Sequence, residues 1–333
     1  MRVSVIAAVA TSVLAAGTMP AIAQWKPERN VQIVVPAGPG GGSDQLGRLV
    51  QSIITKYKLI ERPVSVVNKP GAGSAEGLID VASSKGDPHK LLVALSNLYV
   101  VPLTSDLKFH WTDLEPVAIM GFDDFILWAH ADQPQTTTKD LLAAAKAAPE
   151  PWLMGGTQAK NDDQILTVAI ERATGAKFKY IPYKGGGEVA TQLVGKHITT
   201  NVNNPGENIG QWQAGQVKPY CVFSAQRIGY KAPIASGRAW SDIPTCKESG
   251  LDIEFKVLRV LMLPAGVTAD QRAFYVGVLD KVRQTDEWKA YAETNALQQV
   301  FISGAEAAAY MKADEAMYAK LMREAGFLHP SRQ

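Results

Sequence analysis

Residues 31–54 contain three local structural signals in succession, and their order restricts the folds that the chain can adopt. Val31 to Val35 is a short run rich in β-branched residues, which favours a buried strand. The turn that follows contains Gly40 to Gly42, whose backbone can adopt positive φ and approach another group closely because it has no Cβ atoms. Ser43 or Asp44 then begins a helical pattern as a predicted N-cap. The stretch predicts a strand, a tight turn and a helix.

Such a turn can bind an anion, since free N–H groups and the helix dipole both favour negative charge at a helix N-terminus. It can equally be a connection that binds nothing. The residues of this stretch leave both interpretations open.

The same pattern recurs along the chain. Two further strands end in the glycine turn 68–77 and in the polar pair Ser96-Asn97, and three strands alternating with helices favour a parallel sheet. Residues 152–204 repeat the arrangement, and ligands of such sheets bind at the carboxyl ends of the strands. Two lobes of this kind, with facing turns, predict an α/β protein with a cleft between the lobes.

The N-terminus differs from the rest of the chain. Residues 1–23 have a basic start at Arg2, an apolar run and the small-residue pattern Ala21-Ile-Ala23, which is typical of a secretory signal peptide cleaved before Gln24. The alternative is a membrane anchor, but the apolar run is shorter than the ~20 residues that a spanning helix needs. In an oxidising compartment Cys221 and Cys246 can form a disulfide, and two separate buried thiols are the alternative.

Several kinds of chemistry find no support in the residues. The net charge of +2 does not favour nucleic acid as a partner. The turn at 40–43 lacks the Gly-Lys-Ser/Thr ending of a phosphate loop, and the glycines of 71–77 match a dinucleotide fingerprint only loosely. There is no Gly-x-Ser-x-Gly elbow, and the five histidines show no metal-binding spacing. We therefore predict no catalytic residue, no metal and no cofactor.

Two acidic pairs, Asp162-Asp163 and Asp123-Asp124, are candidates for a paired-carboxylate site or a metal site. Asp162-Asp163 directly precedes a helical run, which favours an N-cap, although Asn161 and Asp162 can also meet a ligand hydroxyl or water. Asp123-Asp124 is predicted to lie in a loop.

Four motifs together resemble the receptors of tripartite tricarboxylate transporters, the Bug-type solute-binding proteins. The resemblance extends over about residues 28–328 and rests on Pro36-x-x-Pro-Gly-Gly-Gly-Ser-Asp44 with Arg48, Asn68-Lys-Pro-Gly-Ala-Gly73, Tyr180-Ile-Pro-Tyr-Lys-Gly185, and Asp242-Ile-Pro-Thr245 with Gly250. It implies a two-lobed type II periplasmic binding fold, with residues 24–122 plus 225–333 in one lobe and 123–224 in the other. Hinge candidates lie near 118–130 and 220–226.

The resemblance also implies a carboxylate held between two glycine turns. Carried over to this chain, the first turn supplies Gly40, Gly41, Gly42, Ser43 and Asp44, and the facing turn supplies Tyr183, Lys184, Gly185 and Gly186. Asp44 is anionic beside an anionic ligand, so we expect it to act as an N-cap or to accept from a bridging water. Residues of the neighbouring strand ends complete the predicted site: Gly73, Ser96, Asn97, Thr157, Gln158, Asn161, Asp162 and Asn203.

The loop 155–164 departs from the family pattern, because many relatives have a Gly/Ser-rich turn with a histidine there. Its amide, hydroxyl and lysine groups suggest a polar end of the ligand or a second carboxylate. The alternative is an aromatic dicarboxylate stacked on Phe122, Phe125 or Trp128. The resemblance implies a monomeric periplasmic receptor that delivers its solute to a membrane permease with a large and a small subunit; an exported enzyme acting on small carboxylates is the alternative.

Overall fold

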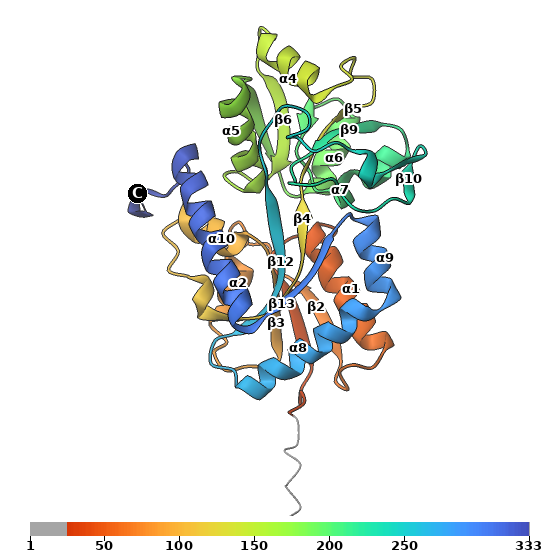
Figure 1. The fold of residues 1–333 in the computed structure, drawn as a ribbon. Coiled ribbons are helices and arrows are strands. Elements are labelled where there is room, and N and C mark those ends of the chain that lie inside the picture. Colours follow the sequence, from red (N-terminus) through yellow and green to blue (C-terminus); the bar gives the residue numbers. More distant parts are fainter. Residues whose placement is uncertain (1–24, 333) are drawn as a thin grey trace, which may run out of the picture.

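The computed structural model describes residues 25–332, which form two lobes, each built around one β-sheet (Figure 1). The predicted signal peptide, residues 1–23, lies outside the described residues. Within residues 25–332 no helix is both long and apolar enough to cross a membrane.

The first lobe contains a six-stranded sheet in the order β13-β4-β12-β3-β1-β2. Strand β1 pairs in parallel with β2 and β3, whereas β12 is antiparallel to β3 and β4, and β13 is antiparallel to β4. The strands are β1 (Val31–Val35), β2 (Val64–Asn68), β3 (Lys90–Ala94), β4 (Leu114–Asp124), β12 (Lys256–Pro264) and β13 (Gln298–Ser303). Glycine or polar turns follow β1, β2 and β3, as the sequence predicts.

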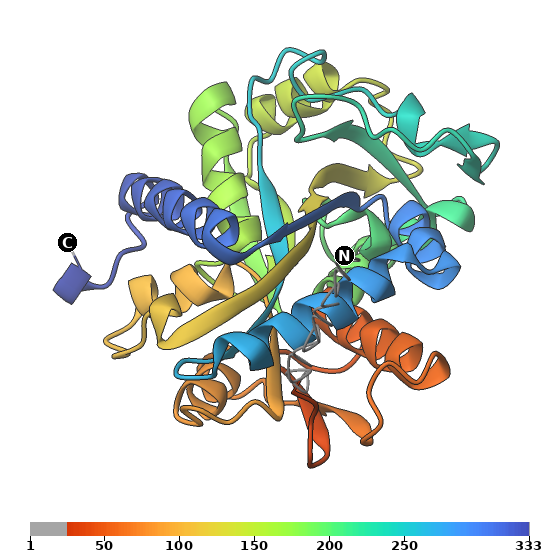
Figure 2. The same ribbon diagram turned by 60° about the horizontal axis from the view of Figure 1, so that its bottom comes forward.

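Helices cover both faces of this sheet, and Figure 2 shows α8 lying along the first lobe. Val31, Ile33 and Val35 pack toward α1, α8 and α9, while Val34 packs toward α2, α3 and α10, as the two-residue period of a strand requires. The elements are α1 (Gly42–Lys56), α2 (Ala75–Ala82), α3 (Asn97–Thr104), η1 (Trp111–Asp113), α8 (Ala269–Gln284), α9 (Asp286–Thr294), α10 (Gly304–Ala325) and η3 (Pro330–Arg332).

The second lobe contains a five-stranded sheet in the order β7-β6-β8-β5-β9. Leu127 and Ala129 of β5 pack with residues of α4 and α5, and Ile126 and Trp128 pack with residues of α6 and α7. The elements are β5 (Ile126–His130), α4 (Thr138–Ala147), β6 (Trp152–Thr157), α5 (Asp162–Thr174), β7 (Phe178–Tyr183), α6 (Gly186–Val194), β8 (Thr200–Asn201), α7 (Pro205–Gln213) and β9 (Val217–Val222). The chain continues with β10 (Pro233–Ala235), β11 (Arg238–Ala239) and η2 (Trp240–Asp242).

The chain passes between the lobes where three phenylalanines lie side by side. The N–H of Phe223 donates to the carbonyl of Phe125 at 2.9 Å, and the N–H of Phe255 donates to the carbonyl of Phe223 at 2.8 Å. Strands β4 and β12 lead from this crossing into the first lobe (Figure 1). The predicted loop at Asp123-Asp124 is wrong, because both residues belong to β4, where they pair with Val257 and Lys256 of β12.

The packing of the residues after 225 indicates where the second lobe ends. Ile228, Ala235, Trp240 and Ile243 share a hydrophobic cluster with residues of β5, α6 and α7. The predicted division assigns them to the first lobe. We propose instead that the second lobe extends from about residue 125 through Cys246.

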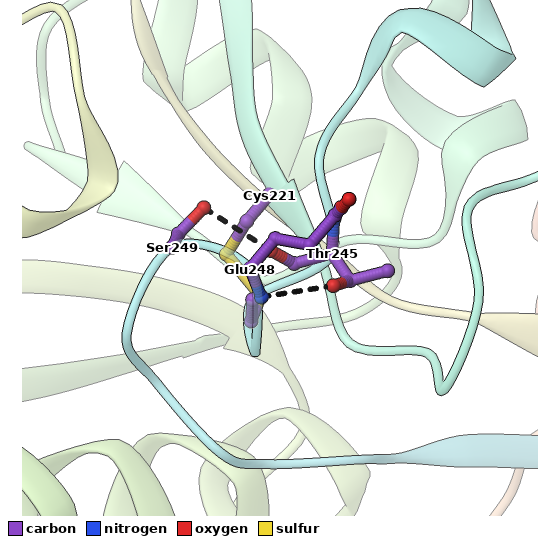
Figure 3. The surroundings of a disulfide bond; sticks show 5 residues. Cys221, Thr245, Glu248 and Ser249 are labelled. Carbon is purple, nitrogen blue, oxygen red and sulfur yellow. Dashed lines mark hydrogen bonds between the residues drawn. A yellow bond between two sulfur atoms is a disulfide. The ribbon is translucent and has the colours of Figure 1, made fainter.

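Cys221 of β9 and Cys246 form a disulfide, so the first of the two alternatives for these cysteines holds in the structure (Figure 3). Their Cα atoms are 4.8 Å apart, and 25 residues separate them in sequence. Thr245 organises the turn beside the bond, because its Oγ1 accepts from the N–H of Glu248 at 3.0 Å and its carbonyl accepts from the hydroxyl of Ser249 at 3.1 Å (Figure 3). The disulfide fastens the segment around residue 246 to the second sheet.

Replacement of both cysteines by alanine is expected to lower the free energy of unfolding by about 3 kcal/mol, because a bridge across a loop of this length restricts the unfolded chain. Denaturant unfolding of the oxidised protein and of the double variant measures the difference. The reduced wild-type protein is the control and should match the variant. Equal stability of the oxidised protein and the variant would contradict the prediction.

Candidate functional site

A cavity of about 490 Å³ lies between the two lobes, at the ends of the strands where the glycine turns gather. The first lobe contributes residues 36–43 of the turn after β1, together with Ser74, residues 95–97, Val257 and Arg259. The second lobe contributes Phe125, Thr157, Gln158, residues 161–163, residues 184–188, Asn204 and Glu207. The volume suits a small molecule.

The turn after β1 exposes the N-terminus of α1 to this cavity. Helix α1 begins at Gly42 with Gly41 as its N-cap, so the predicted N-cap at Ser43 or Asp44 is wrong. Gly40 has a φ of +83°, a conformation that glycine adopts without strain. The N–H groups in the first turn of a helix have no partner within the helix, and those of Gly42 and Ser43 lie at the cavity.

Asp44 is buried and lies outside the residues that line the cavity. Its carboxylate accepts from the N–H of Gly40 at 2.8 Å, from Nε of Arg48 at 2.9 Å and from Nδ2 of Asn68 at 2.9 Å. Burial raises the pKa of Asp44, but these hydrogen bonds outweigh burial and hold the pKa below its usual value. Asp44 therefore stays ionised and fastens the glycine turn to Asn68 at the end of β2.

Arg259 is the main charged residue of the cavity that sequence reasoning missed. Its side chain is 5% exposed, and its Nε and Nη2 donate to Oδ2 of Asp123. A Cβ atom at Gly42 would lie 2.9 Å from Nη2 of Arg259, so the guanidinium packs directly against the start of α1. The cavity thus has a buried cation beside a helix N-terminus, and both favour a bound anion.

The N-terminus of α6 faces a different side chain. A Cβ atom at Gly186 would lie 2.1 Å from the carboxylate carbon of Glu207, so this carboxylate packs against the first residue of α6. Glu207 also accepts from the N–H of Asn204 at 3.2 Å. Burial raises the pKa of Glu207 to about 7, with Arg259 opposing the rise and Asp123 adding to it.

Asp162 joins the two lobes at the edge of the cavity. It lies in the first turn of α5, after the N-cap Asn161, so its predicted role as the N-cap is wrong. Its carboxylate accepts from the hydroxyl of Ser96 and, at 2.7 Å, from the hydroxyl of Tyr318 on α10. Both donors belong to the first lobe. The carboxylate of Asp163 instead makes a contact within the second lobe, where it accepts from the N–H of Thr157 at 2.6 Å.

Most of the predicted site residues line this cavity: Gly40, Gly41, Gly42, Ser43, Ser96, Asn97, Thr157, Gln158, Asn161, Asp162, Lys184, Gly185 and Gly186. Gly73 and Tyr183 line a neighbouring cavity that shares Gly38, Gln158, Asn161 and Lys184 with it. Asn203 is buried behind the site, where its Nδ2 donates to the carbonyl of Gly186 at 2.8 Å and so positions the start of α6.

The three aromatic residues predicted to stack on a ligand lie in different places in the structure. Phe125 lines the cavity and packs edge-on against Phe255. Phe122 packs against Tyr310, and Trp128 is buried between Trp212 and Trp240. Phe125 is thus the one member of this predicted set that lines the cavity.

One signal in the sequence points to Arg259. It is a single charge within the apolar run 257–263, and a charge in a buried strand requires a partner. The partner, Asp123, stands at the end of another apolar run. Within residues 25–332, histidine, cysteine, aspartate and glutamate side chains do not gather into a group of three that could hold a metal ion.

Two α/β lobes with helix N-termini facing an inter-lobe cavity are the features of a type II periplasmic binding fold, and comparison with known proteins supports this class. A family model described as "Tripartite tricarboxylate transporter family receptor" matches residues 46–316. The chain therefore belongs to this receptor family, as the sequence motifs predict. It is 27% identical to Protein BugT of Bordetella pertussis over 226 residues, which cover 66% of this chain and 67% of BugT.

Solved structures share the fold. A TctC solute-binding protein from Polaromonas is 27% identical, with a TM-score of 0.68 over 90% of this chain and 99% of that protein. MatC from Rhodopseudomonas palustris, with bound malate, is 18% identical, with a TM-score of 0.77 over 89% of this chain and 99% of MatC. Another R. palustris protein, with adipate, is 19% identical, with a TM-score of 0.79 over 90% of this chain and 98% of that protein.

Replacement of Tyr318 by phenylalanine is expected to lower the free energy of unfolding by about 1.5–3 kcal/mol, because it removes a hydrogen bond to a buried carboxylate. Tyr310→Phe is the matched control, since the Tyr310 hydroxyl makes no hydrogen bond within residues 25–332. Burial raises the pKa of Asp162, and the hydrogen bonds from Ser96 and Tyr318 lower it. The deficit of Tyr318→Phe should therefore be larger at mildly alkaline pH, where the carboxylate is ionised, than at acidic pH. Denaturant unfolding at both pH values tests this, and equal effects of the two variants would contradict it.

Proposed function

We propose that this protein is a periplasmic receptor that captures a small carboxylate between its lobes and delivers it to a membrane permease with a large and a small subunit. In this proposal residues 1–23 are a signal peptide removed during export, and the protein binds its ligand without changing it. Family membership supports the receptor role, and the malate and adipate named for two proteins of the same fold support a carboxylate ligand.

The observation that carries the proposal is the contact between Arg259 and the start of α1. A ligand carboxylate at this point meets the guanidinium, the free N–H groups of Gly42 and Ser43 and the positive end of the helix dipole. Asp123 holds the guanidinium in place from behind. The proposed carboxylate site is therefore built before the ligand arrives, which reduces the free energy needed to order it.

Hinge bending at the phenylalanine crossing provides the way in and out of the cavity. Binding proteins with two lobes close around their ligands by rotation at a few backbone positions. In this chain the proposed hinge comprises Phe125, Phe223 and Phe255, where backbone hydrogen bonds join adjacent strands. The contact that Asp162 makes with Ser96 and Tyr318 has to break for the lobes to separate.

Mass spectrometry of ligand co-purified with the natively expressed protein is expected to find a small carboxylate, and calorimetric titration of the refolded protein with that compound measures its affinity. Product analysis after incubation separates the receptor from an exported enzyme. Recovery of the ligand unchanged supports the receptor, and turnover would overturn it.

To test Arg259, we pair Arg259→Gln with Asp123→Asn, so that no unpaired charge is left buried. The pair should weaken carboxylate binding by about tenfold or more, whereas Arg323→Gln on the exposed face of α10 should not change it.

Gly42→Ala offers a smaller change at the same point. Its Cβ would lie 2.9 Å from Nη2 of Arg259, so the guanidinium has to move, while a Cβ at Gly41 would lie 3.8 Å from the nearest atom, the carbonyl oxygen of Gly38. We expect Gly42→Ala to weaken ligand binding by about tenfold and Gly41→Ala to change it by less than about threefold. Unfolding measurements on both variants show that the fold is kept. Equal affinities of the two variants would contradict this placement of the carboxylate.

A further inference from the structure

The N-termini of α1 and α6 both face the cavity, but they have different neighbouring side chains. At α1 the neighbouring side chain is the cation Arg259, and at α6 it is the carboxyl group of Glu207, which is an anion above its pKa of about 7. The carboxylate of Glu207 packs against Gly186, the first residue of α6, where the facing half of a two-sided carboxylate clamp was predicted. A carboxylate of the chain itself thus already interacts with this helix N-terminus.

The residues around Glu207 strengthen the negative charge of this wall. Asp163 is close enough that the charge of Glu207 raises its pKa, after burial as the larger cause. Asp123 acts on Glu207 in the same direction. Among the described residues that line the cavity, the cations are Arg259 and Lys184, and Arg259 is paired with Asp123. A second ligand carboxylate placed directly at Glu207 would therefore be repelled.

Glu207 retains capacity to accept a hydrogen bond. Its Oε2 accepts from the N–H of Asn204, and within residues 25–332 no protein group donates to its Oε1. An ionised carboxylate accepts several hydrogen bonds. A ligand in the cavity can supply a further donor, because Glu207 lines the same cavity as Arg259.

From this arrangement we propose that Glu207 selects a ligand that carries a hydrogen-bond donor, an ammonium or a hydroxyl group, in addition to the carboxylate bound at Arg259. The proposal rests on the function proposed above and narrows the ligand class. Plain dicarboxylates lack this donor, and an unpaired charged acceptor in a buried site disfavours a ligand that cannot satisfy it.

The experiment compares matched ligands that differ only at one carbon: succinate, malate and aspartate, and likewise glutarate, 2-hydroxyglutarate and glutamate. Calorimetric titration of the wild-type protein at a pH above about 8, where Glu207 is ionised, should give an affinity for the hydroxyl or the ammonium member at least about tenfold higher than for the plain member. Comparison of the hydroxyl member with the ammonium member of each series shows which of the two groups the protein prefers. In Glu207→Gln, which keeps the size and the contact with Asn204, this preference should fall to within about threefold of unity.

Glu293→Gln is the matched control, since Glu293 is exposed on α9 away from the cavity. It should leave the preference unchanged. Carboxylates that bind without a preference for the donor, or a preference that survives Glu207→Gln, would overturn this inference while the receptor function stands. If none of the six probes binds, the same test is made with the co-purified ligand. A ligand that has a hydrogen-bond donor beside its carboxylate, and that binds more weakly to Glu207→Gln, supports the inference. A ligand without such a donor overturns it. Failure to bind any carboxylate overturns the receptor function itself.

Discussion

The buried ion pair between Asp123 and Arg259 is the interaction on which the site depends. The two residues lie on adjacent strands, β4 and β12, close to the point where these strands leave the first lobe. Removing two charges from water costs several kcal/mol per ion, and an apolar pair would satisfy the strands equally well. The pair does something an apolar pair cannot, because it keeps a cation at the base of the inter-lobe cavity, in contact with the start of α1.

Polar contacts at the edge of the cavity join the two lobes. Asp162 of the second lobe accepts from Ser96 and Tyr318 of the first lobe. Each such bond is exchanged for one with water when the lobes separate, so its net contribution is of the order of 1 kcal/mol. A ligand that contacts both lobes needs only a modest difference in affinity to shift a balance of this size. The geometry is thus suited to a receptor that binds and releases its solute.

The local elements were predictable because their signals are local. The β-branched run at 31–35, the helix that follows the glycine turn at 40–42 and the parallel strands that end in glycine turns all follow from short-range patterns. Asp123 was misplaced because polar residues at the end of an apolar run resemble the start of a loop. Its partner Arg259 lies 136 residues further along the chain, and only the pairing of β4 with β12 brings the two together. The pairing of Cys221 with Cys246 could not be decided from the sequence for the same reason. A separation of 25 residues does not determine whether two cysteines meet in the fold.

The glycine turns explain why similar sequences give unlike sites. Three glycines followed by a helix occur both before α1 and at the start of α6, and in both places the pattern correctly predicts a helix N-terminus at the cavity. A glycine turn has no side chains, so its charge is set by whatever neighbouring elements place against it. At Gly42 the neighbour is a strand of the central sheet that carries an arginine, and at Gly186 it is α7, which carries a glutamate. The backbone makes the two halves of the site alike, and residues distant in sequence make one half electropositive and the other electronegative. A symmetrical pattern in the sequence is therefore compatible with an asymmetrical ligand.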